Sequence, residues 1–270
     1  MIKQAIIPLA GLGTRLLPLT SVVPKELLPI NGKPGLEYIL DECIKSGIKE
    51  VIFVISKRKK IIKDYFYNDN FYRNLLKKNK NNRLKSEYSK IKKYKKMIKF
   101  VYQNSPKGTG DAVLRCKNLI NSKYFLMLMP DDLIINNNCS HSLIKLHNKF
   151  NSSIIASRKV NKKNVSRWGI FKIKKIDKRN FLINDVVEKP SIKSAPSNYA
   201  VIGRYILPKK IFRILRKQKP GLNNEIHITD AIRTLILQKD KFIGHIFAGK
   251  YLDCGSMKGY INSSLEISKI

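Results

Sequence analysis

The first residues with an evident chemical use lie near the start of the chain. The stretch Gly11-Leu12-Gly13-Thr14-Arg15 follows an apolar run at residues 5–10, and Lys25 comes soon after it. A short apolar strand that ends in a glycine turn presents backbone N–H groups to an anion, and Arg15 and Lys25 add positive charge beside them. The stretch therefore predicts a phosphate-binding site.

The glycine spacing excludes two common phosphate loops. The chain has no G-x-x-x-x-G-K-[ST] pattern, and Gly11-x-Gly13 lacks the third glycine of the dinucleotide-binding fingerprint. Pro24 and Pro29 bracket Lys25 and restrict the conformations of its loop. We therefore expect Lys25 to be aimed at a bound phosphate rather than to be one more solvated lysine.

A second group of residues suits a nucleobase. Gln103 ends a predicted strand and is followed by Lys107-Gly108-Thr109-Gly110. A glutamine amide carries both a donor and an acceptor, as the edge of a base does, and glycines let the backbone approach a flat ring. A polar residue at a strand end is also common without any ligand, so the residues alone leave both interpretations open.

Carboxylates at predicted strand ends suggest a metal and a sugar. Asp131 follows the buried run of residues 125–129, and carboxylates beside a phosphate loop suit Mg²⁺, although an aspartate there can also cap a loop. Asp253, before Cys254-Gly255, is a candidate second ligand. Glu188 can accept hydrogen bonds from sugar hydroxyls near Trp168-Gly169, and Lys189 offers a point charge for phosphate.

The elements that must position these residues alternate in the first half of the chain. Strands are predicted at residues 5–10, 50–56, 98–103 and 124–130, and helices at 34–46 and 111–120, with Gly47 closing the first helix. This pattern predicts an α/β fold with a Rossmann-like doubly wound sheet and right-handed crossovers, with ligands across the carboxyl ends of its strands.

The second half loosens into α+β. Its predicted strands are residues 153–157, 169–174, 181–187 and 199–206, and its predicted helices are 209–216 and 229–238. No linker rich in Pro, Gly or Ser separates the halves. We therefore expect one domain, residues 1–270, on a single mixed sheet, with a nucleotide-binding half at 1–150 and a sugar-phosphate-binding half at 151–270.

Composition restricts the class of protein. With 43% hydrophobic residues and no apolar run long enough to span a membrane, the chain is expected to be globular and cytoplasmic, with no membrane partner. Its four cysteines lack metal or redox spacing, and we expect reduced thiols, with Cys43 and Cys116 on the apolar faces of helices. The histidines form no zinc pattern.

The net charge of +35 would ordinarily suggest a nucleic acid or an anionic membrane. The lysines are scattered over the whole chain, and isoleucine and asparagine are also abundant, as AT-rich codons would produce in any protein. We therefore attribute most of the charge to solvated faces and do not expect nucleic acid as a partner. The lysine-rich residues 75–96, with Tyr88 and Tyr94, are expected to form a helical excursion on the surface.

Taken together, the motifs resemble those of the bacterial UDP-glucose pyrophosphorylases, also called UTP:glucose-1-phosphate uridylyltransferases, of the sugar nucleotidyltransferase superfamily. The resemblance covers almost the whole chain. It rests on Gly11-Leu12-Gly13-Thr14-Arg15-x-x-Pro18, Pro24-Lys25, Pro130-Asp131, Val187-Glu188-Lys189-Pro190, Ala195-Pro196-Ser197-Asn198, Gly203-Arg204-Tyr205 and Glu225-Ile226-x-Ile228-Thr229-Asp230-Ala231.

The resemblance implies an enzyme that makes UDP-glucose and pyrophosphate from UTP and glucose 1-phosphate, with Mg²⁺ as cofactor, and a homo-oligomer of open subunit number. A thymidylyl or other sugar-nucleotide specificity on the same scaffold stays open as the alternative. The roles that it implies are uracil binding by Ala10, Gly11, Gln103 and Gly108 beside the Gly13 turn, triphosphate contacts from Arg15 and Lys25, metal binding by Asp131 and Asp253, glucose binding by Gly169 and Glu188, and neutralisation of the sugar phosphate by Lys189.

Overall fold

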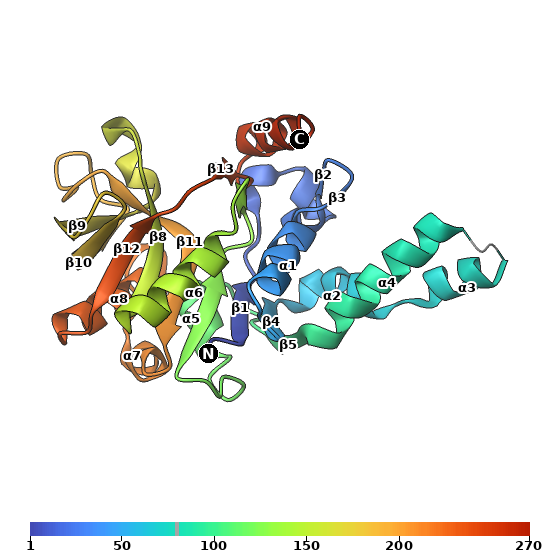
Figure 1. Cartoon of the computed structure of the whole chain (residues 1–270), viewed down its shortest axis with the longest axis horizontal. Helices are drawn as coiled ribbons and strands as arrows, with labels where there is room; N and C mark the ends of the chain where they lie inside the picture. The colour runs from blue at the N-terminus through green and yellow to red at the C-terminus, as the bar shows by residue number, and fades with distance from the viewer. Residues whose placement is uncertain (79–80) are drawn as a thin grey trace.

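The computed structural model describes residues 1–78 and 81–270. Its main feature is one nine-stranded mixed sheet to which both halves of the chain contribute strands (Figure 1). In spatial order the strands are β5 (Ile98–Tyr102), β4 (Glu50–Ile55), β1 (Gln4–Pro8), β6 (Tyr124–Leu128), β11 (Tyr199–Pro208), β8 (Ser153–Lys159), β12 (Phe242–Ile246), β10 (Asn180–Glu188) and β9 (Gly169–Lys175).

The first half of the chain forms the parallel part of the sheet, as predicted. β1 pairs in parallel with β4 and β6, and β4 pairs in parallel with β5. Successive side chains of a strand point to opposite faces, and here both faces are covered: Ile7 and Phe53 join the core on one side, and Ile6 and Ile52 join the core on the other. Burial on both faces explains why these strands are continuous apolar runs.

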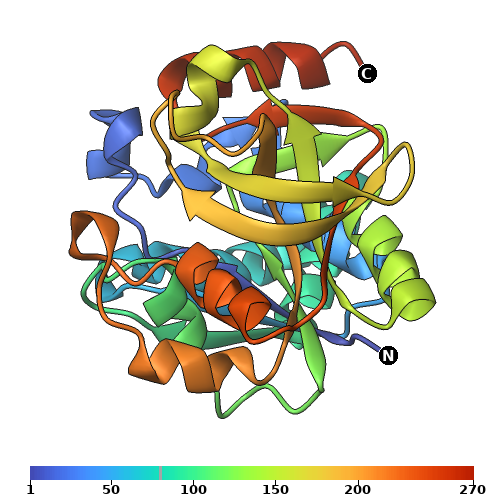
Figure 2. The same ribbon diagram turned by 90° about the vertical axis from the view of Figure 1, so that its left-hand side faces the viewer.

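The second half continues the same sheet with a change of direction. β11 runs antiparallel to both of its neighbours, β6 and β8, whereas β12 is parallel to β8. β9 and β10 form an antiparallel pair at the end of the molecule opposite the projecting arm described below (Figures 1 and 2). The fold is therefore the predicted mixed α/β sheet.

Two small sheets carry loops toward the site. β2 (Pro29–Ile30) pairs with β3 (Lys33–Pro34) just before the first helix. β13 (Lys250–Asp253) pairs with β7 (Asp132–Ile135), and this register sets Asp253 opposite Asp132. The second pairing brings together two segments that lie far apart in the sequence.

Helices cover the sheet, and the predicted ones are present with altered bounds. α1 (Gly35–Lys45) follows Pro34 and ends before Gly47, which has φ +80°, as expected. The helix predicted at 111–120 is wrong in its bounds: α5 is Thr109–Leu114, so Cys116 lies in a turn beyond it rather than on the helix. The others are α2 (Lys60–Tyr67), α3 (Asn70–Lys78), α4 (Asn82–Met97), α6 (Cys139–Phe150), α7 (Ile211–Lys217), α8 (Ile228–Leu237) and α9 (Met257–Ile267).

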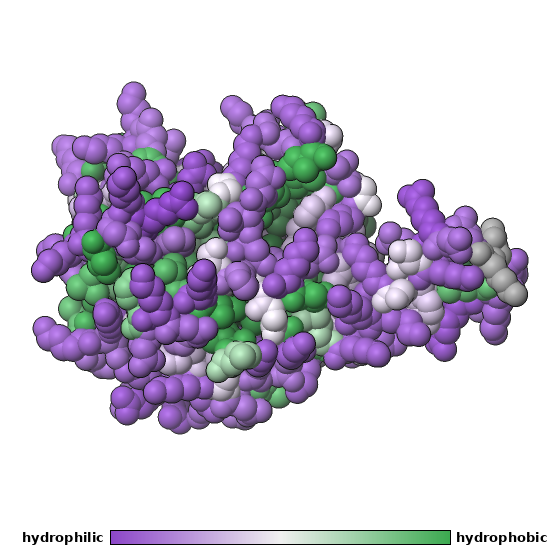
Figure 3. All heavy atoms as spheres, viewed as in Figure 1, coloured by the Kyte–Doolittle hydropathy of each residue, from purple (hydrophilic) through white to green (hydrophobic). Residues whose placement is uncertain are grey.

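The lysine-rich segment is a helical arm, as predicted for its described residues; residues 79–80 lie outside them. α3 and α4 project from the body of the molecule, whose visible surface is mainly hydrophilic (Figures 1 and 3). Tyr94 anchors the base of α4: it is fully buried and donates a hydrogen bond to Asp41 at 2.6 Å. All four cysteines are buried free thiols, and in the described part of the chain no helix is long and apolar enough to cross a membrane.

Candidate active site

Half of the predicted site residues meet in one cavity. It has a volume of about 240 Å³ and lies beyond the carboxyl ends of β6 and β10. Six predicted residues line it: Arg15, Asp131, Gly169, Glu188, Lys189 and Asp253. A larger cavity of about 590 Å³ between α1, β7 and α9 holds none of the predicted residues, so we place the site in the smaller one.

A buried ion pair holds Asp131, which lines the cavity; its partner, Lys25, is not among the lining residues. Lys25 Nζ lies 2.7 Å from Asp131 Oδ2, and the two side chains are only 15% and 14% exposed. Burial alone would lower the pKa of Lys25, but Asp131 and Glu26 outweigh it and the pKa lies above its ordinary value. Likewise burial would raise the pKa of Asp131, but Lys25 holds it below the usual range, so both groups stay charged at neutral pH.

The second predicted metal ligand lies next to the first. A Cβ atom built on Gly255 would stand 2.7 Å from Asp131 Oδ2 and 3.2 Å from Asp253 Oδ1, so the two carboxylates flank this one glycine. Arg167 donates to Asp253 Oδ2 at 2.7 Å. Two neighbouring carboxylates fit Mg²⁺, which is typically held by one or two carboxylates together with substrate phosphates. No cluster of three or more His, Cys, Asp or Glu suited to a metal occurs among residues 1–78 and 81–270.

The cavity also contains the residues predicted to bind a sugar. Glu188 ends β10 opposite Gly169 at the start of β9, and a Cβ on Gly169 would lie 3.2 Å from Glu188 Oε2. Thr229 donates to that same oxygen at 2.8 Å, which orients the carboxylate. Lys189 follows with φ +44°, a strained conformation for a residue with a side chain, and its ammonium lies 4.0 Å from Glu188 Oε1.

The glycine turn after β1 has the conformation that its sequence requires. Gly13 has φ +73°, in the left-handed region that favours glycine, and Thr20 donates a hydrogen bond to its carbonyl at 2.8 Å. Ala10 is buried and Gly11 is exposed at the mouth of this turn. Arg15 comes next, with its side chain 64% exposed and 3.6 Å from Asp131 Oδ2.

Lys59, which the sequence did not reveal, supports the segment that leads into this turn. Lys59 donates to Leu9 O at 2.6 Å and pairs with the Glu26 carboxylate at 2.8 Å, and both side chains are buried. Burial lowers the pKa of Lys59 despite the attraction of Glu26. In a chain with so many lysines, nothing in the sequence distinguishes Lys59 from its solvated neighbours.

The predicted base-binding residues lie just outside the cavity. Gln103 is buried at the end of β5, and its amide nitrogen donates to Asp111 Oδ2 at 2.6 Å and to Gly108 O at 3.1 Å. The donor half of the amide is thus engaged within the protein. Gly108 has φ +93°, and a Cβ there would lie 2.6 Å from Ile226 O, so this glycine permits close approach of backbone to backbone.

Asp132, the second aspartate of the pair after β6, has a structural role. Its Oδ2 accepts from Gly203 N at 2.8 Å and its Oδ1 accepts from Tyr251 at 2.6 Å. Burial and the charge of Asp131 raise the pKa of Asp132 to about 6. The two adjacent aspartates therefore have different contacts: Asp131 lies beside Lys25 and Arg15, whereas Asp132 links β7 to β11 and β13.

Comparison with known proteins agrees with the geometry. The model of the nucleotidyl transferase family matches residues 4–270. The UTP–glucose-1-phosphate uridylyltransferase of Bacillus subtilis is 37% identical over 271 residues, which cover 99% of this chain and 91% of that protein.

Solved structures show the same similarity. A UDP-glucose pyrophosphorylase complexed with UDP-glucose superposes with a TM-score of 0.86 at 38% identity, covering 100% of this chain and 99% of the other. A UTP-bound UGPase from Acinetobacter baumannii gives 0.88 at 33% identity, covering 99% and 93%. These matches extend along nearly the whole chain, whose site holds a pair of carboxylates flanked by cations. The chain therefore belongs to the nucleotidyl transferase family and, within it, to the UTP–glucose-1-phosphate uridylyltransferases.

Proposed function

We propose that this protein transfers the uridylyl group of UTP to glucose 1-phosphate, giving UDP-glucose and pyrophosphate. The observation that carries the proposal is the single cavity lined both by Asp131, which is paired with Lys25, and by Glu188. One wall suits a metal-bound triphosphate, and the other suits a sugar with vicinal hydroxyls. The relatives named for this reaction, and those solved with UTP and UDP-glucose, support the choice of substrates.

On the nucleotide side, Arg15 and Lys25 contact the triphosphate beside the Gly13 turn. Lys25 is held protonated by its carboxylate partner, so it offers a full positive charge at neutral pH. Uracil lies near Ala10, Gly11, Gln103 and Gly108. Because the Gln103 nitrogen is engaged with Asp111, we assign the reading of the base to its oxygen, which can accept the N–H of the uracil ring.

On the sugar side, Glu188 accepts hydrogen bonds from glucose hydroxyls and Gly169 lets the ring approach the sheet. Thr229 leaves one carboxylate oxygen of Glu188 committed and the other available. Lys189 neutralises the phosphate of the sugar. Its ammonium is partly exposed on the cavity wall, where it can follow the incoming dianion.

The reaction needs no catalytic base. The second pKa of a phosphate monoester is about 6, so the attacking oxygen is already deprotonated at neutral pH. The obstacle is repulsion between two anions, and Lys25, Lys189 and Arg15 reduce it while holding the reactants in line. Asp131 and Asp253 would hold Mg²⁺, which supplies further charge neutralisation on the phosphates. The bond to the α-phosphorus forms as the bond to pyrophosphate breaks.

The proposal extends to the organisation of the chain. Residues 1–150 contribute the nucleotide-binding half and residues 151–270 the sugar-phosphate-binding half of one domain. The Gly110 N–H donates to Ile226 O at 2.7 Å, so the two halves are also joined by backbone hydrogen bonds beside the site. We further propose that the enzyme acts in the cytoplasm as a homo-oligomer. Four buried free thiols suit a reducing compartment.

The test is Mg²⁺-dependent release of pyrophosphate from UTP, with and without glucose 1-phosphate. We expect release only when both substrates and the metal are present, and loss of release in Asp131→Asn. Replacing UTP by dTTP in the same assay tests the thymidylyl alternative, for which dTTP would be preferred. Absence of release from either nucleotide would overturn the proposed function.

A further inference from the structure

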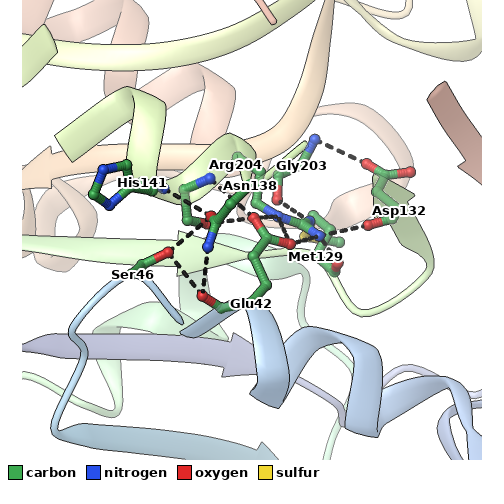
Figure 4. Close-up of polar contacts among 9 residues, drawn as sticks. Glu42, Ser46, Met129, Asp132, Asn138, His141, Gly203 and Arg204 are labelled. Atoms are coloured by element: carbon green, nitrogen blue, oxygen red, sulfur yellow. Dashed lines mark hydrogen bonds and ion pairs between the residues drawn. The ribbon is translucent and has the colours of Figure 1, made fainter. Parts of the chain in front are cut away.

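An arginine that no substrate can reach lies directly behind Asp131. Arg204, on β11, has no exposed surface, and its guanidinium forms a fork with Glu42 of α1: Nε lies 3.0 Å from Oε1 and Nη2 lies 2.8 Å from Oε2 (Figure 4). Ser140, at the start of α6, donates both its N–H and its hydroxyl to Glu42 Oε1. The pair thus joins two helices to the central strand of the sheet.

The remaining guanidinium donors reach the backbone around Asp131. Nη1 donates to Met129 O at 3.2 Å and to Gly203 O at 2.9 Å, and Nη2 donates to Asp132 O at 2.8 Å. The carbonyls on either side of Pro130-Asp131 are therefore held by one rigid group. The carbonyl of Asp131 itself accepts from Cys254 N at 2.8 Å, which ties the same turn to the segment that carries Asp253.

Stability alone does not account for this arrangement. Removing two charges from water is costly, and apolar residues of similar volume often replace a buried ion pair without loss of stability. What an apolar pair cannot supply is a planar set of donors with fixed directions. Here those donors bind three backbone carbonyls, and two of these carbonyls lie at the two ends of the turn that presents the Asp131 carboxylate.

We propose that Arg204 is a positioning residue for the metal site, with Glu42 as its anchor: it fixes the turn of residues 129–132 so that the Asp131 carboxylate points into the cavity before the nucleotide arrives. This inference rests on the proposed role of Asp131 as a metal ligand. Groups that orient a ligand in this way typically affect metal affinity or activity 10–100-fold.

The test compares the binding of UTP with and without metal. Isothermal titration calorimetry gives the dissociation constant of UTP in EDTA and in saturating Mg²⁺, and the ratio of the two reports how strongly the site prefers the metal-bound nucleotide, without any turnover. We expect Asp131→Asn to lower this ratio on the order of tenfold. Arg204→Lys, which keeps the charge but not the fork, is expected to lower it by a similar factor.

Ser140→Ala is the matched control, because it removes a hydrogen bond to Glu42 and leaves every guanidinium contact in place. Its ratio should stay within about twofold of the wild type. If Arg204→Lys does not fold, Glu42→Gln replaces it, since one amide N–H then faces the guanidinium and the fork loses its anchor. A wild-type ratio in the folded variant, while Asp131→Asn has lost it, would overturn the inference alone. A wild-type ratio in Asp131→Asn would instead overturn the proposed metal role on which it rests.

Discussion

Replacing Lys25 by methionine should reveal how much the buried pair with Asp131 contributes to stability and to catalysis. Lys25 Nζ lies 2.7 Å from Asp131 Oδ2, and the two side chains are almost equally buried. Lys25→Met therefore leaves the Asp131 carboxylate without its main partner, in a place that water hardly reaches. Removing one member of a buried pair costs about 3–5 kcal/mol. Arg15 stays 3.6 Å away but is 64% exposed, so it offsets little of that cost.

A destabilisation of that size should lower the melting temperature on the order of 10 °C in a chain of this length. The double variant Lys25→Met/Asp131→Asn should recover most of the loss, because neither charge then remains unpaired. Turnover should not recover. Lys25→Met and the double variant should each be slower than the wild type by about 10²-fold or more, the usual effect of losing one preorganised charge contact.

Thermal unfolding followed by circular dichroism gives the stabilities, and pyrophosphate release at a temperature well below every transition gives the rates. Asp131→Asn alone completes the double-mutant cycle. Two results would refute the reasoning. A double variant no more stable than Lys25→Met would show that the unpaired carboxylate is not the source of the destabilisation, and near-wild-type turnover in Lys25→Met would remove this lysine from the catalytic group.

Three further predictions concern the sugar wall, the metal wall and the distal sheet. Thr229→Val removes the donor that orients Glu188, so KM for glucose 1-phosphate should rise about fivefold or more while KM for UTP changes little. Initial rates at varied glucose 1-phosphate and at varied UTP give the two constants, and equal changes in both would contradict this prediction. Gly255→Ala places a Cβ 2.7 Å from Asp131 Oδ2, so turnover should fall by at least about tenfold in a Mg²⁺ titration, and unchanged turnover would show that the carboxylates do not converge there. The pKa of His245 is lowered, first by burial, so the unfolded chain binds more protons and stability is lost as pH falls below the ordinary value of 6.5. His245→Gln should reduce this loss, measured as the free energy of urea unfolding against pH. Parallel curves for the variant and the wild type would refute the prediction.

The elements near the start of the chain could be predicted because their signals are local. The apolar runs of β1 and β4 reflect burial on two faces, and the spacing of apolar residues in α1, with Pro34 before it and Gly47 after it, describes one helix face and its two ends. The site residues at the ends of these elements could also be predicted, because the carboxyl ends of parallel strands meet at one edge of a sheet.

Other elements left weak signals. The strands β7, β12 and β13 lack an apolar run as long as those that indicated the comparably short strands β1 and β6, and α6 and α9 were not predicted from the sequence. α5 ends at Leu114 although apolar residues continue to Ile120, because those residues pack in successive turns against the same core. The antiparallel direction of β11 also has no local signature, since a strand buried on both faces has the same composition in either direction.

The sequence by itself determined the chemistry available to this protein: a glycine turn with two cations, carboxylates at strand ends, and a glutamate-lysine pair for a phosphorylated sugar. The tertiary structure decided which of those groups work together. It paired Lys25 with Asp131, set Asp253 beside them, and placed Arg204 against Glu42 across 162 positions of sequence. Such contacts depend on how distant segments pack, and a pattern of neighbouring residues describes only the burial of each segment, not its partner.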